Sequence, residues 1–336
     1  MKDNLQMSDA QLAMRARRSP AVRRSLSGWL AARFLGVVAA VLRRFPDRLL
    51  HRVAHAAGGV LYRLQPARRR LVRDNLQRVC RYLAEHDMAG PAAAAAAHDG
   101  QALDRLVRAA FGHYVRGYLE GAILPVYGDD SHAGRVRADD PDLAAQAFPA
   151  GRLGPTIIVG MHFGAIEVPA LFASRRLGAR VTAPMETIAD PQLQAYFERT
   201  RGRTGINVVP LEGAAAELRG ALGRGETVAL VADRPVGGSG TAVELFGAPA
   251  RLPAGPAVLA LESDAPVWVI ATRRSGWGEY RSRFERLEML DGDSRRERLA
   301  AFMSAEARAF ERAVADAPEQ WWTVFFPIWD QPRTAR

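Results

Sequence analysis

A histidine and a glutamate stand five positions apart, at His162 and Glu167, shortly after the apolar run Thr156–Val159. We expect that run to form a strand, followed by a turn that carries His162 and a helix that begins near Gly164. On one continuous helix the two side chains would lie about 140° apart and could not meet. With His162 in the turn and Glu167 in the first helical turn, the carboxylate can reach the imidazole.

Such a pair predicts a general base. The carboxylate of Glu167 would fix the proton on one ring nitrogen of His162 and stabilise the imidazolium, while the other nitrogen takes a proton from a substrate hydroxyl. The carboxyl ends of strands are also where open α/β sheets place their sites. The spacing alone is equally compatible with a histidine that only packs in the turn.

Three arginines at alternate positions, Arg199, Arg201 and Arg203, follow further along the chain. A guanidinium binds a phosphate through two parallel hydrogen bonds, so this cluster could form a cationic clamp on an anionic substrate. The alternative is the solvated end of a surface helix.

Two more segments contain candidate substrate-binding residues. Asp233 and Arg234 follow the apolar run Thr227–Val231, at a position where an acidic residue can belong to a site or can simply form a turn. The Pro- and Gly-rich segment that begins at Phe246 and includes Arg251 has the rigid, apolar character that the wall of a groove for a long apolar chain needs. A tight loop has the same composition.

The elements that must position these residues are predicted to form an α/β fold. From about Thr156 onward, short β-branched runs alternate with helical segments, which is typical of a mostly parallel central sheet flanked by helices. The predicted strands are 156–159, 207–211, 227–231 and 267–272, and a last helix is expected from about Ser294 to Ala315.

The first part of the chain shows almost only helical patterns. We therefore predict a poorly ordered Arg-rich tail over 1–26, a helical membrane-associating region over 27–125 and an α/β domain over 126–330. Within the helical region, Gly90, Pro91 and the run Ala92–Ala97 indicate a low-complexity insert or a loosely packed connection.

An apolar run near the N-terminus, Phe34–Leu42, lies between Arg33 and the pair Arg43–Arg44. It is too short to span a bilayer, which takes about 20 apolar residues. A signal peptide is disfavoured because two arginines stand where a cleavage site needs small residues. We expect one or two amphipathic helices over Trp29–Leu64, lying on a membrane surface or, alternatively, packed on the body of the protein.

The charge of the chain indicates an anionic partner. The 336 residues include 46 basic and 36 acidic ones, for a formal net charge of +10, and Lys2 is the only lysine. Phosphates attract such a protein, whether in lipid head groups, in a nucleotide carrier or in nucleic acid. The sequence contains no nucleic-acid-binding motif, so we expect no nucleic acid partner. The single cysteine, Cys80, rules out an intramolecular disulfide.

In this order and spacing, the segments resemble the bacterial branch of the lysophospholipid acyltransferase superfamily, which includes lipid A late acyltransferases and phosphatidylinositol mannoside acyltransferases. The matching positions are His162 and Glu167 for the His-x4-Asp/Glu motif, Arg201 and Gly205, Asp233, Phe246–Pro256, Asp74-Asn75-Leu76 and Pro318–Trp322. The closing Pro327-Ile-Trp329 and the loop around Arg251 are more similar to the mannoside enzymes.

The resemblance implies an enzyme that transfers an acyl group from acyl-CoA or acyl carrier protein to a hydroxyl of a glycolipid or phospholipid. It implies His162 and Glu167 as catalytic residues, and Arg201, Asp233, Phe246 and Arg251 as substrate-binding residues. From the same two charged segments we add Arg199 and Arg234 as substrate-binding candidates. No metal or cofactor is implied. Main-chain N–H groups near Gly164 are the expected donors to the tetrahedral oxyanion.

The resemblance also implies a peripheral protein on an anionic membrane surface, at the cytoplasmic face of the inner membrane. Two other functions stay open at this point: a lipid A-type acceptor with the same chemistry, and a non-catalytic lipid-binding paralogue. The presence of both His162 and Glu167 disfavours the paralogue.

Overall fold

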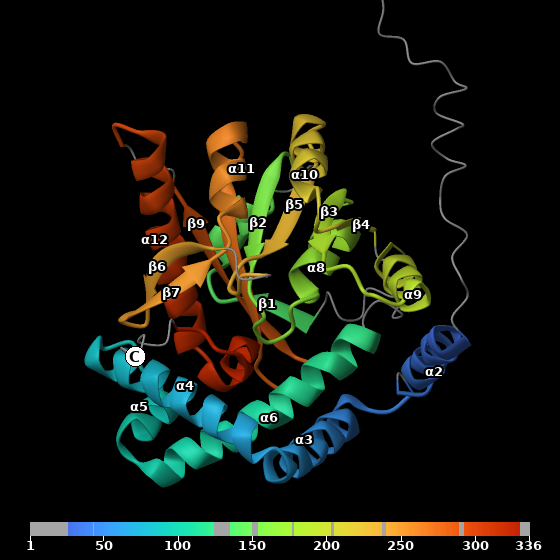
Figure 1. The fold of residues 1–336 in the computed structure, drawn as a ribbon, viewed down its shortest axis with the longest axis vertical. Coiled ribbons are helices and arrows are strands. Elements are labelled where there is room, and N and C mark those ends of the chain that lie inside the picture. Colours follow the sequence, from blue (N-terminus) through green and yellow to red (C-terminus); the bar gives the residue numbers. More distant parts are fainter. Residues whose placement is uncertain are drawn as a thin grey trace, which may run out of the picture.

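The computed structural model describes residues 26–42, 44–123, 135–149, 154–176, 178–202, 205–236, 240–288 and 292–329. The predicted tail over 1–26 falls almost entirely outside these residues. In the described part, a central sheet has helices on both faces, and a further group of helices lies along one side of it (Figure 1).

The central sheet has seven strands in the order β1-β9-β8-β2-β5-β3-β4. All neighbouring pairs are parallel except β8 and β9, which form an antiparallel hairpin. The strands are β1 (Val136–Ala138), β2 (Thr156–Gly160), β3 (Val181–Met185), β4 (Ile206–Pro210), β5 (Thr227–Val231), β8 (Val267–Arg274) and β9 (Tyr280–Leu287). A separate antiparallel hairpin consists of β6 (Thr241–Leu245) and β7 (Ala248–Leu252). The predicted α/β class with a mostly parallel sheet is confirmed.

Both faces of the sheet carry apolar side chains, as a buried parallel strand requires. On β2, Ile157 and Val159 pack in the core cluster that includes α10, α11 and α12, whereas Ile158 packs in the cluster on the other face with α7 and α8. These helices are α7 (Pro141–Ala147), α8 (Val168–Arg176), α10 (Ala214–Gly223), α11 (Gly255–Ser263) and α12 (Arg295–Ala315). The strand is therefore covered on both sides, and Ile158 and Gly160 in its carboxyl-terminal half border the cavity described below.

The remaining helices gather along the lower side of the sheet in Figure 1. They are α2 (Leu26–Leu42), α3 (Asp47–Leu64), α4 (Pro66–Glu85), α5 (Pro91–His98) and α6 (Gly100–Ile123), while α9 (Pro191–Gly202) lies beside α2. The N-terminal stretch thus forms two helices, α2 and α3. Among the described residues, no helix is both long and apolar enough to cross a membrane.

The alanine-rich segment is not the loosely packed connection that we expected. It forms α5, with Pro91 in its first turn and with Ala93, Ala96 and Ala97 buried in the core. Alanine has the highest helix propensity and a small side chain, so a run of it suits a short helix that must approach α4 and α6 closely.

Two buried glutamates on α12 differ sharply in their surroundings. Glu311 accepts hydrogen bonds from the main chain of Phe246, from the Tyr82 hydroxyl and from Arg308. Glu306 is fully buried, and no hydrogen bond from any described residue reaches either of its carboxyl oxygens. Burial, assisted by the charge of Asp233, raises the pKa of Glu306 well above its usual value, so the folded protein favours the protonated carboxyl group.

We expect the substitution Glu306→Met to stabilise the protein. Methionine keeps most of the side-chain volume and removes two buried oxygens that have no hydrogen-bond partner among the described residues. An unsatisfied buried polar group costs about 1–3 kcal/mol of stability. The gain in the free energy of unfolding should also grow with pH. Above the ordinary carboxyl pKa the unfolded wild-type chain loses a proton that the folded chain retains, so wild-type stability falls until the raised pKa is passed.

Denaturant unfolding of both proteins at pH 5 and pH 8 measures this difference. Glu311→Met is the matched control on the same helix. It should destabilise the protein, because three hydrogen-bond donors lose their acceptor. A loss of stability in Glu306→Met at both pH values would show that the carboxyl group has a partner in solution.

Candidate active site

His162 and Asp233 meet at the carboxyl ends of two neighbouring strands. The parallel pair β2 and β5 aligns Gly160 with Val231, and each of the two side chains stands two residues beyond its strand. Equal steps beyond aligned strands bring them together, and Nδ1 of His162 lies 2.7 Å from Oδ1 of Asp233.

The carboxylate of Asp233 is fully buried and fully hydrogen-bonded. Besides Nδ1, Oδ1 accepts the main-chain N–H of His162 at 3.0 Å. Oδ2 accepts the indole N–H of Trp321 at 2.8 Å and the hydroxyl of Thr323 at 2.6 Å. Burial alone would raise the pKa of Asp233, but His162 and these hydrogen bonds lower it to about 2, so Asp233 is ionised throughout the physiological range.

The imidazole of His162 is hydrogen-bonded through Nδ1 to Asp233, and the side chain remains partly accessible. Its side chain is 31% exposed, and it lines the large cavity described below. Burial lowers the pKa of His162, but the charge and hydrogen bond of Asp233 outweigh that effect, so the pKa is raised above 6.5. With Nδ1 donating to Asp233, Nε2 is the nitrogen that can accept a proton from a bound molecule.

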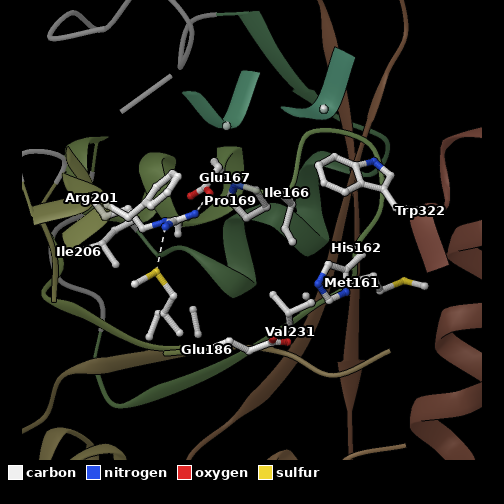
Figure 2. Close-up of a pocket in the computed structure, with 18 of the residues that line it drawn as sticks. Met161, His162, Ile166, Glu167, Pro169, Glu186, Arg201, Ile206, Val231 and Trp322 are labelled. Carbon is white, nitrogen blue, oxygen red and sulfur yellow. Dashed lines mark hydrogen bonds and ion pairs between the residues drawn. The ribbon is translucent and has the colours of Figure 1, made fainter. Parts of the chain in front are cut away.

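Glu167 does not make the contact with His162 that we expected. It lies in the turn before α8, and its Oε1 accepts a hydrogen bond from Nη2 of Arg201 on α9 at 2.7 Å. Arg201 also directs Nη1 at the sulfur of Met185 and stacks over the ring of Phe197 (Figure 2). The imidazole takes Asp233 as its partner because the register of β2 and β5 brings that carboxylate to Nδ1. The assignment of Glu167 as catalytic stays a prediction.

The turn between His162 and Glu167 requires a glycine. Gly164 has a φ of +50°, and a Cβ at this position would overlap the carbonyl oxygen of Thr272 on β8. Its N–H donates to the carbonyl of Gln320 at 2.9 Å, and the N–H of Ala165 donates to Thr272 at 2.8 Å. Both groups are therefore already occupied, so they are not the oxyanion donors that we expected near Gly164.

A cavity of about 680 Å³ opens beside His162. Figure 2 shows His162 and Trp322 toward one side of it, and Arg201 and Ile206 toward the other. Most of the lining is apolar, and it comes from β2 to β5, β8, α8, α9 and the two N-terminal elements α2 and α6. On α2 the lining residues are Leu35, Val38 and Leu42, which makes this helix one wall of the cavity.

The predicted substrate-binding residues separate into two groups. Arg201 and Arg234 line the cavity, and Arg234 also donates to Glu186 at 3.2 Å. Arg199 and Arg251 are exposed and are not among the lining residues, and Phe246 is buried in the core against Trp321. Arg203 lies outside the described residues. Among those described, no cluster of three or more His, Cys, Asp or Glu side chains could hold a metal ion.

Sequence reasoning missed the contribution of the C-terminal segment. In the motif Pro318–Trp322, the indole N–H of Trp321 donates to Asp233, and the main-chain N–H of Trp322 donates to the carbonyl of His162 at 2.7 Å. The signal was present as a pair of tryptophans in an otherwise ordinary segment, but nothing in it indicated which residue it would contact.

A model of the bacterial lipid A biosynthesis acyltransferase family matches residues 16–329. The chain belongs to this family. It is therefore an acyltransferase, as its motifs indicated.

Two similar proteins are mycobacterial. A phosphatidylinositol mannoside acyltransferase of Mycolicibacterium smegmatis is 27% identical over 222 residues, which cover 65% of this chain and 70% of the relative. A phosphatidylinositol mannoside acyltransferase of Mycobacterium tuberculosis H37Rv is 29% identical over 164 residues, which cover 48% of this chain and 50% of the relative. These matches support the resemblance drawn from the sequence.

We expect kcat of acyl transfer to rise with pH, with a midpoint above 6.5, because the base must be neutral and Asp233 raises its pKa. Asp233→Asn should move the midpoint down, since the effect of burial on the pKa is then opposed only by the charge of Glu186. The same change should reduce kcat by about 10²–10⁴-fold, because an amide can hold the wrong tautomer of His162. A pH–rate profile of each protein, with melting temperatures as the folding control, tests this. An unshifted midpoint in Asp233→Asn would contradict the pairing.

The contact between Glu167 and Arg201 predicts that their substitutions are not additive. If Glu167 acts by holding Arg201, then Glu167→Gln should reduce activity in the wild type and should have little further effect in an Arg201→Met background. A double-mutant cycle on kcat/KM measures the coupling. Fully additive losses would mean that Glu167 acts on the reaction independently of Arg201.

Proposed function

We propose that this chain transfers a fatty acyl group from a thioester donor, acyl-CoA or acyl carrier protein, to a hydroxyl of a glycolipid or phospholipid. The observation that carries the proposal is the His162–Asp233 pair at the edge of a mostly apolar cavity of about 680 Å³. An acyl chain needs a site of this polarity, and the acceptor hydroxyl needs a base next to the reactive end of that chain.

In the proposed mechanism, Nε2 of His162 takes the proton of the acceptor hydroxyl, and the hydroxyl oxygen attacks the carbonyl carbon of the thioester. The carbon–sulfur bond then breaks, the new ester bond remains, and the imidazolium returns its proton to the departing thiolate. Asp233 stabilises the imidazolium between the two steps. For the oxyanion, the next main-chain donors along the turn are Ile166 and Glu167, both of which line the cavity just before α8 begins.

For the acceptor we favour a phosphatidylinositol mannoside-like lipid, because the mycobacterial relatives carry that name. Arg201 and Arg234 are the arginines that line the cavity, and they suit an anionic head group or carrier phosphate. The substrate-binding roles of Arg199, Phe246 and Arg251 stay predictions. A lipid A-type acceptor is the alternative, and the description of the matching family favours it.

We also propose that the protein lies peripherally on an anionic membrane, at the cytoplasmic face of the inner membrane. Two helices support this. On α2, Phe34 and Val37 are 67% and 62% exposed, and on α3 Leu49, Val53 and Val60 are exposed too. Arginines accompany these apolar side chains, an arrangement suited to the boundary between lipid head groups and acyl chains.

Deletion of the gene in its source organism, followed by mass spectrometry of extracted lipids, tests the proposed function. A phosphatidylinositol mannoside that lacks one acyl chain is the expected product, and wild-type protein but not His162→Ala should restore it. Loss of a chain from lipid A would identify the alternative acceptor. A lipid profile with no under-acylated species would contradict the proposal, and assays with acyl-CoA and acyl carrier protein in parallel separate the donors.

A further inference from the structure

Behind the turn that carries His162 lies a buried network of three charged side chains. Arg116 and Glu120 stand one turn apart on α6, and Nε of Arg116 donates to Oε1 of Glu120 at 2.8 Å. Arg274, the last residue of β8, donates to Oε2 of Glu120 at 2.9 Å through Nε and at 2.6 Å through Nη2. The three side chains are only 5–7% exposed.

Arg274 also reaches the turn itself. Its Nη2 donates to the carbonyl oxygen of Gly164 at 2.8 Å, two residues after His162. The same glycine donates its N–H to Gln320, and the side chain of Gln320 pairs with both main-chain groups of Arg274, at 2.9 and 3.0 Å. One arginine thus joins the turn, the end of β8 and the C-terminal motif.

Stability alone does not explain such a network. Replacing buried ion pairs by apolar side chains of similar volume is often neutral or stabilising, because desolvating the charges costs about as much as their attraction returns. A charge-assisted hydrogen bond to a main-chain carbonyl does something that an apolar side chain cannot do, which is to fix the position of that carbonyl. At Gly164, which any larger residue would distort, this contact determines the course of the chain directly after the base.

We propose that Arg274 is a positioning residue for acyl transfer. Glu120 orients its guanidinium, and the guanidinium holds the Gly164 carbonyl, so that the imidazole of His162 stands within hydrogen-bonding distance of the acceptor hydroxyl in the cavity. Arg116 neutralises the second oxygen of Glu120 but does not touch the turn. The inference rests on the proposed role of His162 as the base.

The role of Arg116 provides the matched control. Arg116→Gln removes the hydrogen bond to Glu120 and the ion pair with Asp47 at 3.6 Å, whereas Arg274→Gln removes two hydrogen bonds to Glu120 and the one to Gly164, so both should lower the melting temperature. Only Arg274→Gln releases the Gly164 carbonyl. Since a misplacement of about 1 Å can reduce a rate by about 10²-fold, we expect kcat of Arg274→Gln to fall by about 10–100-fold with little change in the KM of the donor. For Arg116→Gln we expect kcat to stay within about threefold of wild type.

Steady-state kinetics and melting temperatures of both variants and of Arg274→Lys test the proposal. Lysine keeps the charge but lacks the fork that serves Glu120 and Gly164 together, so its kcat should also fall. Equal losses of kcat in Arg116→Gln and Arg274→Gln, in proportion to lost stability, would overturn the proposal. So would a failure of both Arg274 variants to fold while Arg116→Gln folds, which would give the network a purely structural role.

The variant His162→Ala separates this proposal from the proposed function. Full activity in His162→Ala would refute the role of His162 as the general base. Any loss of kcat in the Arg274 variants could then not be due to a displaced base. An inactive His162→Ala together with an active Arg274→Gln would refute only the positioning role.

Discussion

The buried carboxylate of Asp233 receives four hydrogen bonds from two distant parts of the chain. His162 contributes its main-chain N–H and its imidazole, while Trp321 and Thr323 contribute from the C-terminal segment. A buried carboxylate is tolerated only when donors surround it in this way, because removing a charge from water costs several kcal/mol. The same four contacts therefore fix the base, the end of β5 and the C-terminal segment relative to one another.

The C-terminal segment extends this arrangement into the helical part of the protein. Asn75 on α4 donates to the carbonyls of Val324 and Phe326, and Tyr82 on the same helix donates to Glu311 on α12. The helices before residue 124 are thus tied to the sheet through residues far away in the sequence. Helix α6 packs against α4 and α2 packs against α6, and both α2 and α6 form walls of a cavity whose reactive end belongs to β2 and β5.

The helix α2 presents apolar side chains to two different surroundings. Leu35, Val38 and Leu42 line the cavity, whereas Phe34 and Val37 point away from the body and are largely exposed. A helix that is apolar all round is normally buried on every side. With a membrane on its outer face, as we propose, α2 would separate the lipid surface from the cavity by the width of a single helix.

Much of the fold could be predicted from sequence because it depends on local patterns. The β-branched runs became β2, β4, β5 and β8, and the periodic apolar residues after Ser294 became α12 with Ser294 as its N-cap. Strands β1, β3 and β9 and the hairpin of β6 and β7 were not predicted. Proline interrupts β3 and β7, and the pairing of β1 depends on a partner far away in the sequence. The alanine run was misinterpreted as a connection because its helix is stabilised by packing against α4 and α6.

The residue types of the site were visible in the sequence, but their partners were not. His162, Glu167, Arg201 and Asp233 were all singled out, and the spacing of the first two suggested that they pair. Tertiary structure decided otherwise, because adjacent parallel strands bring residues 71 positions apart to hydrogen-bonding distance, while Glu167 meets Arg201 from another helix. Local spacing determines which face of an element a side chain occupies, whereas strand order and register determine which carboxylate an imidazole meets.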